Sequence, residues 1–315
     1  MARRLLPLLI LLAALAPPCT ASAKIPIRVG IGDQQTAMFD QSAFQRAKFR
    51  RVRYFIAWNA MDNAGQRLAA RAYVQRARRA GIRVFLHISS DDLRIKRARL
   101  PSVAQYRSKV GRLVRYFRRV GVREFGAWNE ANHASQPTYR SPARAAAFFR
   151  EMYRLVKRRC PTCAVVALDV LDQRGVGTYM RRFFAKLSRT WRRRAKIVGI
   201  HNYGDVNRRR TTYTRNIIRT AHRYNRSVKI WFTETGGIVK FGASFPCSPR
   251  RAASRLKNMF SLARAYRRSG VQRVYVYNWT GAGCGARFDA GLTNHDGSPR
   301  PGYWTLRAQL AKYER

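Results

Sequence analysis

Acidic residues are scarce in this sequence: its 315 residues include 15 Asp plus Glu against 64 Lys plus Arg, a formal net charge of +49. Such a surface attracts polyanions, so nucleic acids and acidic cell-wall polymers are both candidate partners. No recognition motif or charged tail concentrates the arginines, which are spread over the outward faces of nearly every expected helix. We therefore favour an acidic polymer over nucleic acid, although charge alone leaves both open.

Long apolar runs are also lacking. The run Leu5 to Ala16 is shorter than the roughly 20 residues that a membrane-spanning helix needs, and no later stretch is long enough. Two arginines precede this run and Ala21-Ser22-Ala23 follows it, which is typical of a secretory signal peptide. We expect residues 1–23 to be that signal and residues 24–315 to form one secreted or cell-wall associated domain without a membrane span. An N-terminal anchor is the alternative.

Cysteines are few, and removal of the signal would leave an even set: Cys160, Cys163, Cys247 and Cys284. Four cysteines allow three disulfide pairings, and an exported protein is expected to form them. The close pair Cys160 and Cys163 most simply bridges itself, which leaves Cys247 with Cys284. A redox-active pair or half of a zinc site are alternatives for the C-x-x-C spacing, but no second C-x-x-C or nearby His supports zinc.

A dinucleotide-binding loop is missing. Gly30-Ile31-Gly32 follows the first expected strand, but the third glycine and the helical pattern that should come next are absent. No His and carboxylate cluster has the spacing of metal ligands on one element either. We therefore expect neither a cofactor nor a metal.

Eight apolar, β-rich runs alternate with helical patterns along the chain. Roughly one helix separates each pair, with no linker and no low-complexity segment, which favours a parallel sheet. Eight such units in one domain-sized chain predict an α/β fold of the closed type, a single-domain (β/α)8 TIM barrel, and a doubly wound open sheet is the alternative. The expected strands are 27–31, 52–56, 82–88, 122–127, 164–168, 196–201, 228–233 and 271–277.

Two glutamates, Glu130 and Glu234, lie where expected strands four and seven give way to loops. In a barrel both would lie at the C-terminal ends of strands, the face where active sites are built. Two carboxyl groups facing each other there can cleave a glycosidic bond, about 5 to 5.5 Å apart in a retaining enzyme and roughly 6.5 to 9.5 Å apart in an inverting one. Alternatively, each glutamate caps a helix or pairs with an arginine.

The Asn129-Glu130 dipeptide after strand four and Glu234 at the end of strand seven, in this barrel order, resemble the clan A retaining glycoside hydrolases, the four/seven superfamily. The resemblance covers essentially the whole chain after the expected signal, and it does not point to one family within the clan. It implies that Glu130 is the acid/base, that Glu234 is the nucleophile, and that Asn129 binds the sugar 2-hydroxyl.

The same resemblance suggests further substrate-binding residues. His201 and Tyr203 match the strand-six motif whose tyrosine orients the nucleophile, and Arg53 lies on strand two, where the clan often keeps an arginine near the nucleophile. Trp279 looks like the strand-eight tryptophan that forms the floor of the central sugar subsite. For His201 and Tyr203, a core histidine and an ordinary rim tyrosine are the alternatives.

Other candidates come from position alone. His87 ends strand three, where it would line the same mouth, and Trp58 offers a flat apolar face suited to a pyranose ring. A tryptophan in such a place is otherwise a core residue. Asp169 and Asp172 follow strand five, where we expect helix caps rather than substrate ligands.

The sequence therefore predicts a secreted, monomeric retaining glycoside hydrolase that needs no cofactor. Its substrate would be a β-linked poly- or oligosaccharide, and the basic surface suits an acidic one. The alternative is a non-catalytic barrel that binds a glycan or a polyanion, either a cell-wall polymer or nucleic acid. That alternative requires one of the two glutamates, Glu130 or Glu234, to point away from the mouth.

Overall fold

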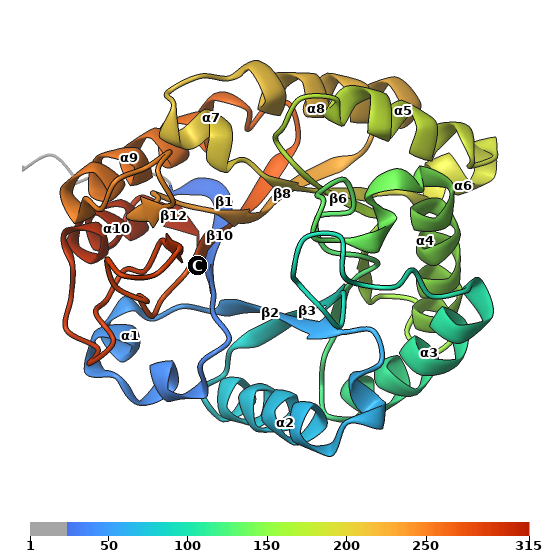
Figure 1. Cartoon of the computed structure of the whole chain (residues 1–315), viewed down its shortest axis with the longest axis horizontal. Coiled ribbons are helices and arrows are strands. Elements are labelled where there is room, and N and C mark those ends of the chain that lie inside the picture. Colours follow the sequence, from blue (N-terminus) through green and yellow to red (C-terminus); the bar gives the residue numbers. More distant parts are fainter. Residues whose placement is uncertain (1–23, 315) are drawn as a thin grey trace, which may run out of the picture.

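The computed structural model describes residues 24–314, and the expected signal segment lies outside the described residues. Parallel strands form a central barrel that is surrounded by helices (Figure 1). The barrel strands are β1 (Ile25–Gly32), β2 (Arg51–Ala57), β3 (Arg83–Ser89), β4 (Glu124–Gly126), β5 (Ala164–Val166), β6 (Leu168–Leu171), β7 (Ile197–His201), β8 (Lys229–Thr235) and β10 (Val271–Tyr277).

The barrel closes at Ala167, which separates β5 from β6. β5 pairs with β4, whereas β6 pairs with β7, so the two short strands are halves of one fifth strand that changes partner at this residue. Ala167 itself donates its N–H to the Ile197 carbonyl oxygen at 2.9 Å. All eight expected strands are therefore present in order, and the (β/α)8 barrel is confirmed over the doubly wound sheet.

Helices cover the outside of the strands (Figure 1). They are α1 (Ser42–Ala47), α2 (Ala64–Arg79), α3 (Val103–Arg119), α4 (Pro142–Lys157), α5 (Val176–Ala185), α6 (Arg189–Arg194), α7 (Tyr203–Asn207), α8 (Thr212–Tyr224), α9 (Pro249–Ala265) and α10 (Pro301–Leu310), with short 3-10 helices η1 (Thr36–Asp40), η2 (Ala60–Asp62) and η3 (Pro137–Arg140). None of those within residues 24–314 is long and apolar enough to span a bilayer.

Helix α3 shows how the sequence sets these helices. Its N-cap Ser102 accepts a hydrogen bond from the Gln105 N–H, and the Gln105 side chain accepts one from the Ser102 N–H, which forms a capping box. Tyr106, Val110 and Phe117 lie on the buried face, as the 3.6-residue period predicts. The arginines between them are consequently directed outwards.

Three further strands were not expected from the sequence. β9 (Lys240–Phe241) and β11 (Phe288–Asp289) form a small antiparallel sheet, which joins the loops after β8 and β10. β12 (Tyr313–Glu314) adds to the edge of β1. Two-residue strands carry too little alternation to be read from a sequence.

An ionic and aromatic layer fills the barrel interior below the C-terminal ends of the strands. The Arg273 guanidinium donates to the buried Glu124 carboxylate at 2.5 Å and lies 3.7 Å from the centre of the Trp231 ring. Phe85 and Tyr275 pack in the same layer. Pairing compensates part of the cost of burying the Arg273 and Glu124 charges.

Candidate active site

A cleft of about 380 Å³ opens at the C-terminal ends of the strands. Glu130 and Glu234 both line it, together with Asn129 and Tyr203. The structure thus brings together residues that are distant in the sequence: Asn129 and Glu234 are 105 positions apart. His87, Trp58 and Trp279 do not line it, as described below.

Glu234 is held by a buried cation and a tyrosine. Its side chain is nearly buried, Arg53 donates from Nη1 to its Oε2 at 2.7 Å, and the Tyr203 hydroxyl donates to its Oε1 at 3.1 Å. Burial lowers the pKa of the Arg53 guanidinium, but the Glu234 and Asp169 carboxylates outweigh it and raise the pKa. Two donors, one of them charged, thus fix the position of both Glu234 oxygens.

A shift in strand register aims Glu234 into the barrel. Gly199 of β7 is opposite Trp231, whereas His201 is opposite Glu234, so β8 contains one extra residue between these pairs. Regular alternation would place the neighbours Thr233 and Glu234 on opposite faces. Because the bulge relaxes that alternation, Thr233 bonds the buried Asp169 carboxylate while Glu234 reaches the cleft.

Glu130 lies four residues beyond the last residue of β4 in a left-handed backbone conformation, with φ of 42°. A residue other than glycine pays on the order of 1 to 3 kcal/mol for such a conformation. Asp169 compensates, because its Oδ1 accepts from the Glu130 N–H at 3.0 Å and its carbonyl oxygen accepts from the Ala131 N–H at 2.9 Å. The carboxyl group of Glu130 is thereby fixed toward the cleft.

His201 lies between the two carboxylates. This fully buried ring has Nδ1 3.1 Å from Glu130 Oε1 and 3.7 Å from Glu234 Oε2. Because both oxygens are that close to one nitrogen atom, they lie at most about 6.8 Å apart. The other ring nitrogen, Nε2, is 3.0 Å from Asp169 Oδ1.

These contacts determine the charges of the network. Burial lowers the pKa of His201, but the Asp169 and Glu234 carboxylates outweigh burial and raise it to about 10. Burial raises the pKa of Glu130, but the hydrogen bond and the charge of His201 outweigh it and lower that pKa. Burial likewise raises the pKa of Asp169, but His201, His87 and Arg53 hold it well below its ordinary value. The resting site therefore contains an imidazolium that donates to two carboxylates.

Asn129 and His87 complete the surroundings of Arg53. Arg53 Nη2 donates to Asn129 Oδ1 at 2.5 Å, which leaves the amide NH₂ of Asn129 as the group available to a ligand. His87 is fully buried with Nδ1 3.3 Å from the same Nη2. Burial above all, together with Arg53 and His201, lowers the pKa of His87 to about 3, so this ring is neutral. His87 thus lies behind Arg53 and does not line the mouth, contrary to expectation.

Two glycines make room for these buried polar side chains. A Cβ atom at Gly126 would lie 2.1 Å from the His87 ring, and one at Gly199 would lie 2.1 Å from the Asp169 carboxylate. Both contacts are far shorter than any real carbon contact, so these two positions accept no side chain without displacement of the network. The absence of a side chain at Gly126 and Gly199 leaves the space that His87 and Asp169 occupy.

The expected tryptophan platforms are not in the cleft. Trp279 is 0% exposed, donates from Nε1 to Gln41 Oε1 at 2.5 Å, and packs edge-on against Phe44 and Tyr303. The hollow between α1 and α10 offers the indole both apolar contacts and an acceptor, so Trp279 is a core residue. Trp58 is half-buried and packs against the core rather than lining the cleft.

Other aromatic residues take their place. Tyr277, the last residue of β10, lines the cleft together with Phe245 and with Phe241 and Phe288 of the small β9–β11 sheet. The Arg208 guanidinium lies 4.8 Å from the centre of the Phe245 ring on the same wall. The lining of the cleft therefore includes an aromatic wall with a cation on it, in addition to the carboxylates.

Two disulfides are present, with the expected pairings Cys160–Cys163 and Cys247–Cys284. The second bridge connects the loop that follows β9 with the loop that follows β10. It therefore fixes the segments that carry the aromatic wall. Among residues 24–314, no group of three or more His, Cys, Asp and Glu side chains is arranged to hold a metal ion.

The two aspartates after strand five differ in role. Asp172 accepts from the Gly204 and Asp205 N–H groups at 2.8 and 2.6 Å, so it caps α7 as expected for a cap. Asp169 caps no helix; it is buried under the two glutamates. Its position inside an apolar strand, between Leu168 and Val170, was the one signal in the sequence that could have identified it.

A protein-family model described as the glycosyl hydrolase catalytic core matches residues 114–303. No curated protein matches the sequence. Several solved structures share the fold, all at low sequence identity. A family 39 glycoside hydrolase from the gut symbiont Bacteroides cellulosilyticus WH2 aligns with a TM-score of 0.64 and 16% identity over 90% of this chain and 63% of that chain. This chain thus spans less than two thirds of that protein.

Two other solved structures are aligned over nearly their whole length. A GH10 protein from Paenibacillus barcinonensis has a TM-score of 0.63 and 14% identity, over 92% of this chain and 97% of that chain. A fungal β-1,4-galactanase has a TM-score of 0.66 and 12% identity, over 89% and 98% respectively. At these identities the likeness establishes the barrel fold alone.

Proposed function

This chain belongs to the glycosyl hydrolase catalytic core family, and we propose that it cleaves a β-linked glycan with retention of configuration at the anomeric carbon. The observation that carries the proposal is the shared contact of Glu130 and Glu234 with His201 Nδ1. It limits the nearest carboxyl oxygens to at most about 6.8 Å. In retaining enzymes the two carboxyl groups are about 5 to 5.5 Å apart, which is within this limit. In inverting enzymes the separation is roughly 6.5 to 9.5 Å, and most of that range exceeds the limit.

In the proposed first step, Glu234 attacks the anomeric carbon. Arg53 and Tyr203 donate to its two oxygens, so the attacking carboxylate is held in place before the sugar arrives. The bond between the anomeric carbon and the leaving oxygen breaks as the bond to Glu234 forms, and Glu130 gives a proton to that oxygen. The Asn129 NH₂ group is placed to donate to the sugar beside these carboxylates.

Glu130 must carry a proton at that moment, although His201 lowers its pKa in the free site. We assign the source to His201: its Nδ1 proton passes to Glu130 Oε1, 3.1 Å from Nδ1, when bound sugar excludes water from the cleft. The products of this transfer are a neutral imidazole and a neutral carboxylic acid. Asp169 keeps the Nε2 proton in place throughout.

The second step reverses these roles. Once Glu234 is esterified its negative charge is gone, and Glu130, now a carboxylate, takes a proton from the incoming water. The water oxygen attacks the anomeric carbon and releases Glu234. Two successive inversions leave the configuration unchanged.

The substrate class follows from the walls of the cleft. The aromatic side with Tyr277 and Phe245 suits the C–H faces of pyranose rings. Arg208, exposed on that side, suits a carboxylate on the sugar. Export of the protein, which the two disulfides support, would give it access to extracellular glycans. The monomeric state stays a prediction.

The inactive-barrel alternative required one glutamate to point away from the mouth. Both Glu130 and Glu234 line the cleft, which favours catalysis over simple binding.

The test uses aryl β-glycosides and two variants. Glu234→Ala should abolish hydrolysis, and added azide should restore turnover with a glycosyl azide of inverted configuration. Glu130→Ala should retain turnover on aryl glycosides with good leaving groups and lose it on poor ones. Glu314→Ala, which removes a surface glutamate on β12 paired with Arg28, is the matched control and should behave like the parent. Unchanged turnover of Glu234→Ala, or of Glu130→Ala on substrates with poor leaving groups, would refute the assignment.

A further inference from the structure

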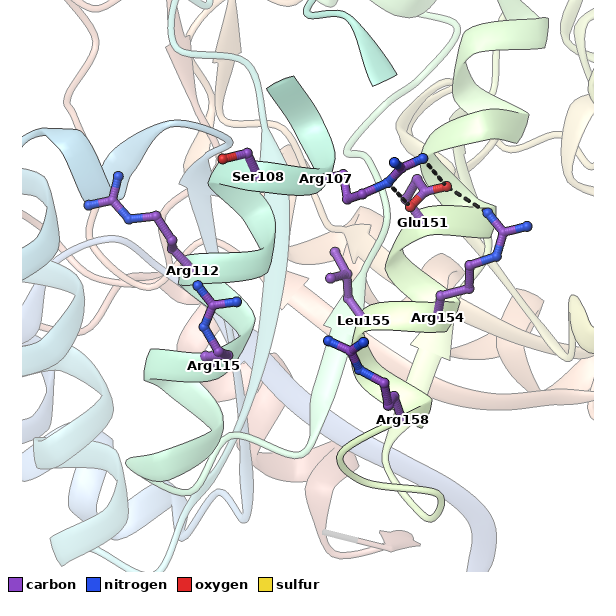
Figure 2. A pocket seen from close by; sticks show the side chains of 8 residues that line it. All are labelled: Arg107, Ser108, Arg112, Arg115, Glu151, Arg154, Leu155 and Arg158. Atoms are coloured by element: carbon purple, nitrogen blue, oxygen red, sulfur yellow. Dashed lines mark hydrogen bonds and ion pairs between the residues drawn. The ribbon is translucent and has the colours of Figure 1, made fainter. Parts of the chain in front are cut away.

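A second hollow lies outside the barrel, between α3 and α4 (Figure 2). Its volume is about 460 Å³. We call it the α3–α4 groove, and it is lined by Arg107, Ser108, Arg112, Arg115, Glu151, Arg154, Leu155 and Arg158. Five arginines and one glutamate thus border one concave surface.

This concentration of charge distinguishes the groove from other hollows of the surface. Three of them, next to Lys48, Lys96 and Arg209, are each lined by two basic residues. Figure 2 shows Arg107 and Arg154 converging on Glu151, and Arg115 and Arg158 on either side of Leu155. Arg112 points away from α4 and pairs with Asp62.

One end of the groove already holds a carboxylate. Arg107 donates from Nε and Nη2 to the two oxygens of Glu151, at 2.8 and 3.3 Å, and Arg154 donates to the same carboxylate at 2.6 Å. This fork-shaped contact is the geometry by which arginine recognises planar carboxylates. The Glu151 carboxylate therefore shows that arginines of this groove can bind a carboxylate group.

The other end has cations without a matching acid. Arg115 and Arg158 are exposed, and the guanidinium group of neither forms a hydrogen bond or an ion pair with another residue in the range 24–314. Burial and the charges of Arg158 and Arg115 lower the pKa of the neighbouring Arg159. An anion between Arg115 and Arg158 would relieve this repulsion.

The groove also has an apolar floor. Leu155 lies between the arginines, and the small Ser108 and Gly111 on α3 leave the space above it open; a Cβ at Gly111 would already lie 3.3 Å from the Leu155 side chain. No aromatic side chain lines the groove. A base-stacking platform, on which single-stranded nucleic acids depend, is thus lacking within the groove lining.

We propose that the α3–α4 groove binds an acidic polysaccharide, with uronate carboxylates held by Arg115 and Arg158 and a sugar ring resting on Leu155. Helices α3 and α4 lie on the outside of the barrel (Figure 1). The groove between them shares no lining residue with the cleft at the strand ends. It anchors the protein to a polymer independently of hydrolysis. The proposal goes beyond the proposed function and does not require it.

The test measures binding of the chain from residue 24 onwards to fluorescein-labelled oligogalacturonate at about 0.15 M salt. Arg115→Glu/Arg158→Glu should weaken binding at least about tenfold and make binding less sensitive to salt. The matched control is Arg219→Glu/Arg223→Glu on α8, which changes the net charge equally at two exposed arginines outside the groove, and it should stay within about twofold of the parent. Equal losses in both variants would overturn the proposal, because they would indicate non-specific attraction.

Three further measurements separate the remaining outcomes. Neutral dextran should not bind; if it binds equally well, the role of charge is refuted. A DNA duplex that binds as tightly as oligogalacturonate and loses as much in the groove variant would replace the polysaccharide as the partner. Should the double glutamate variant fail to fold, Arg115→Gln/Arg158→Gln is used with the same expectation. Glu234→Ala should bind oligogalacturonate as tightly as the parent does. If neither protein hydrolyses aryl glycosides but both bind the polymer, the proposed hydrolysis fails and the proposed binding at the groove stands.

Discussion

Replacement of Asp169 by asparagine should remove most of the pH dependence that His201 gives to folding. The amide has the shape of the carboxylate but lacks the charge that contributes most to the raised pKa of His201. That pKa is about 10 in the folded chain, against an ordinary 6.5. The folded state therefore binds this proton more tightly, and the stabilisation is complete below about pH 6.5 and is lost as pH rises toward 10.

The difference in pKa corresponds to a loss of at most on the order of 5 kcal/mol between those pH values. The parent should lose free energy of unfolding across this range, and Asp169→Asn should lose much less. Asp169→Asn should also be less stable than the parent at pH 6.5, by about 3 to 5 kcal/mol, because a buried ion pair is broken.

The assay is urea denaturation at pH 6.5, 8 and 10, read by tryptophan fluorescence. The decisive quantity is the difference between parent and variant at each pH, since other titrating groups contribute equally to both. Asp172→Asn is the matched control three residues further on: its carboxylate accepts from the Gly204 and Asp205 N–H groups rather than from the His201 ring, and it should follow the parent between pH 8 and 10. If the curves of parent and Asp169→Asn are parallel from pH 6.5 to 10, His201 is not the charged group that the geometry indicates.

Three other expectations concern residues around the cleft. Trp279→Ala should destabilise the fold by about 3 to 5 kcal/mol in urea denaturation while the KM of the folded fraction stays unchanged, because the indole is core; a selective rise in KM would instead place it in the sugar site. Cys247→Ser/Cys284→Ser should raise KM severalfold, and loss of the 37-residue loop closure limits the cost in stability to about 4 kcal/mol; an unaltered KM would separate the bridge from the aromatic wall. Burial raises the pKa of Asp172 to about 8, so its protonated form stabilises the fold below about pH 4 and this contribution fades by pH 8; Asp172→Asn should abolish that decline, measured by thermal unfolding, and a persisting decline would contradict it.

The strands and the two glutamates at their ends could be predicted from the sequence, because both depend on the order of residues within short segments. Apolar runs determine where strands lie, and Glu130 and Glu234 follow or end two of them at equivalent places. The disulfide pairing was accessible for a similar reason, since three-residue spacing favours a local bridge. The catalytic and binding roles assigned by resemblance stay predictions.

The direction of individual side chains was not accessible. Tyr277 rather than Trp279 lines the cleft, because the chain turns outward after β10 toward a pocket formed by α1 and α10. Asp169 was taken for a helix cap because its partners Glu130 and His201 are more than 30 residues away on each side. Such contacts arise only when the barrel closes, and no periodicity within one segment encodes them.

The extra residue in β8 couples the positions of Glu130 and Glu234. Thr233 anchors the aspartate beneath Glu130, and the very next side chain is Glu234. A single-residue deletion in this strand would turn one of these two side chains out of the interior and so disturb the surroundings of both glutamates. The number of residues inside β8 is therefore fixed by Glu130 and Glu234 at once, whatever the loops around the cleft contain.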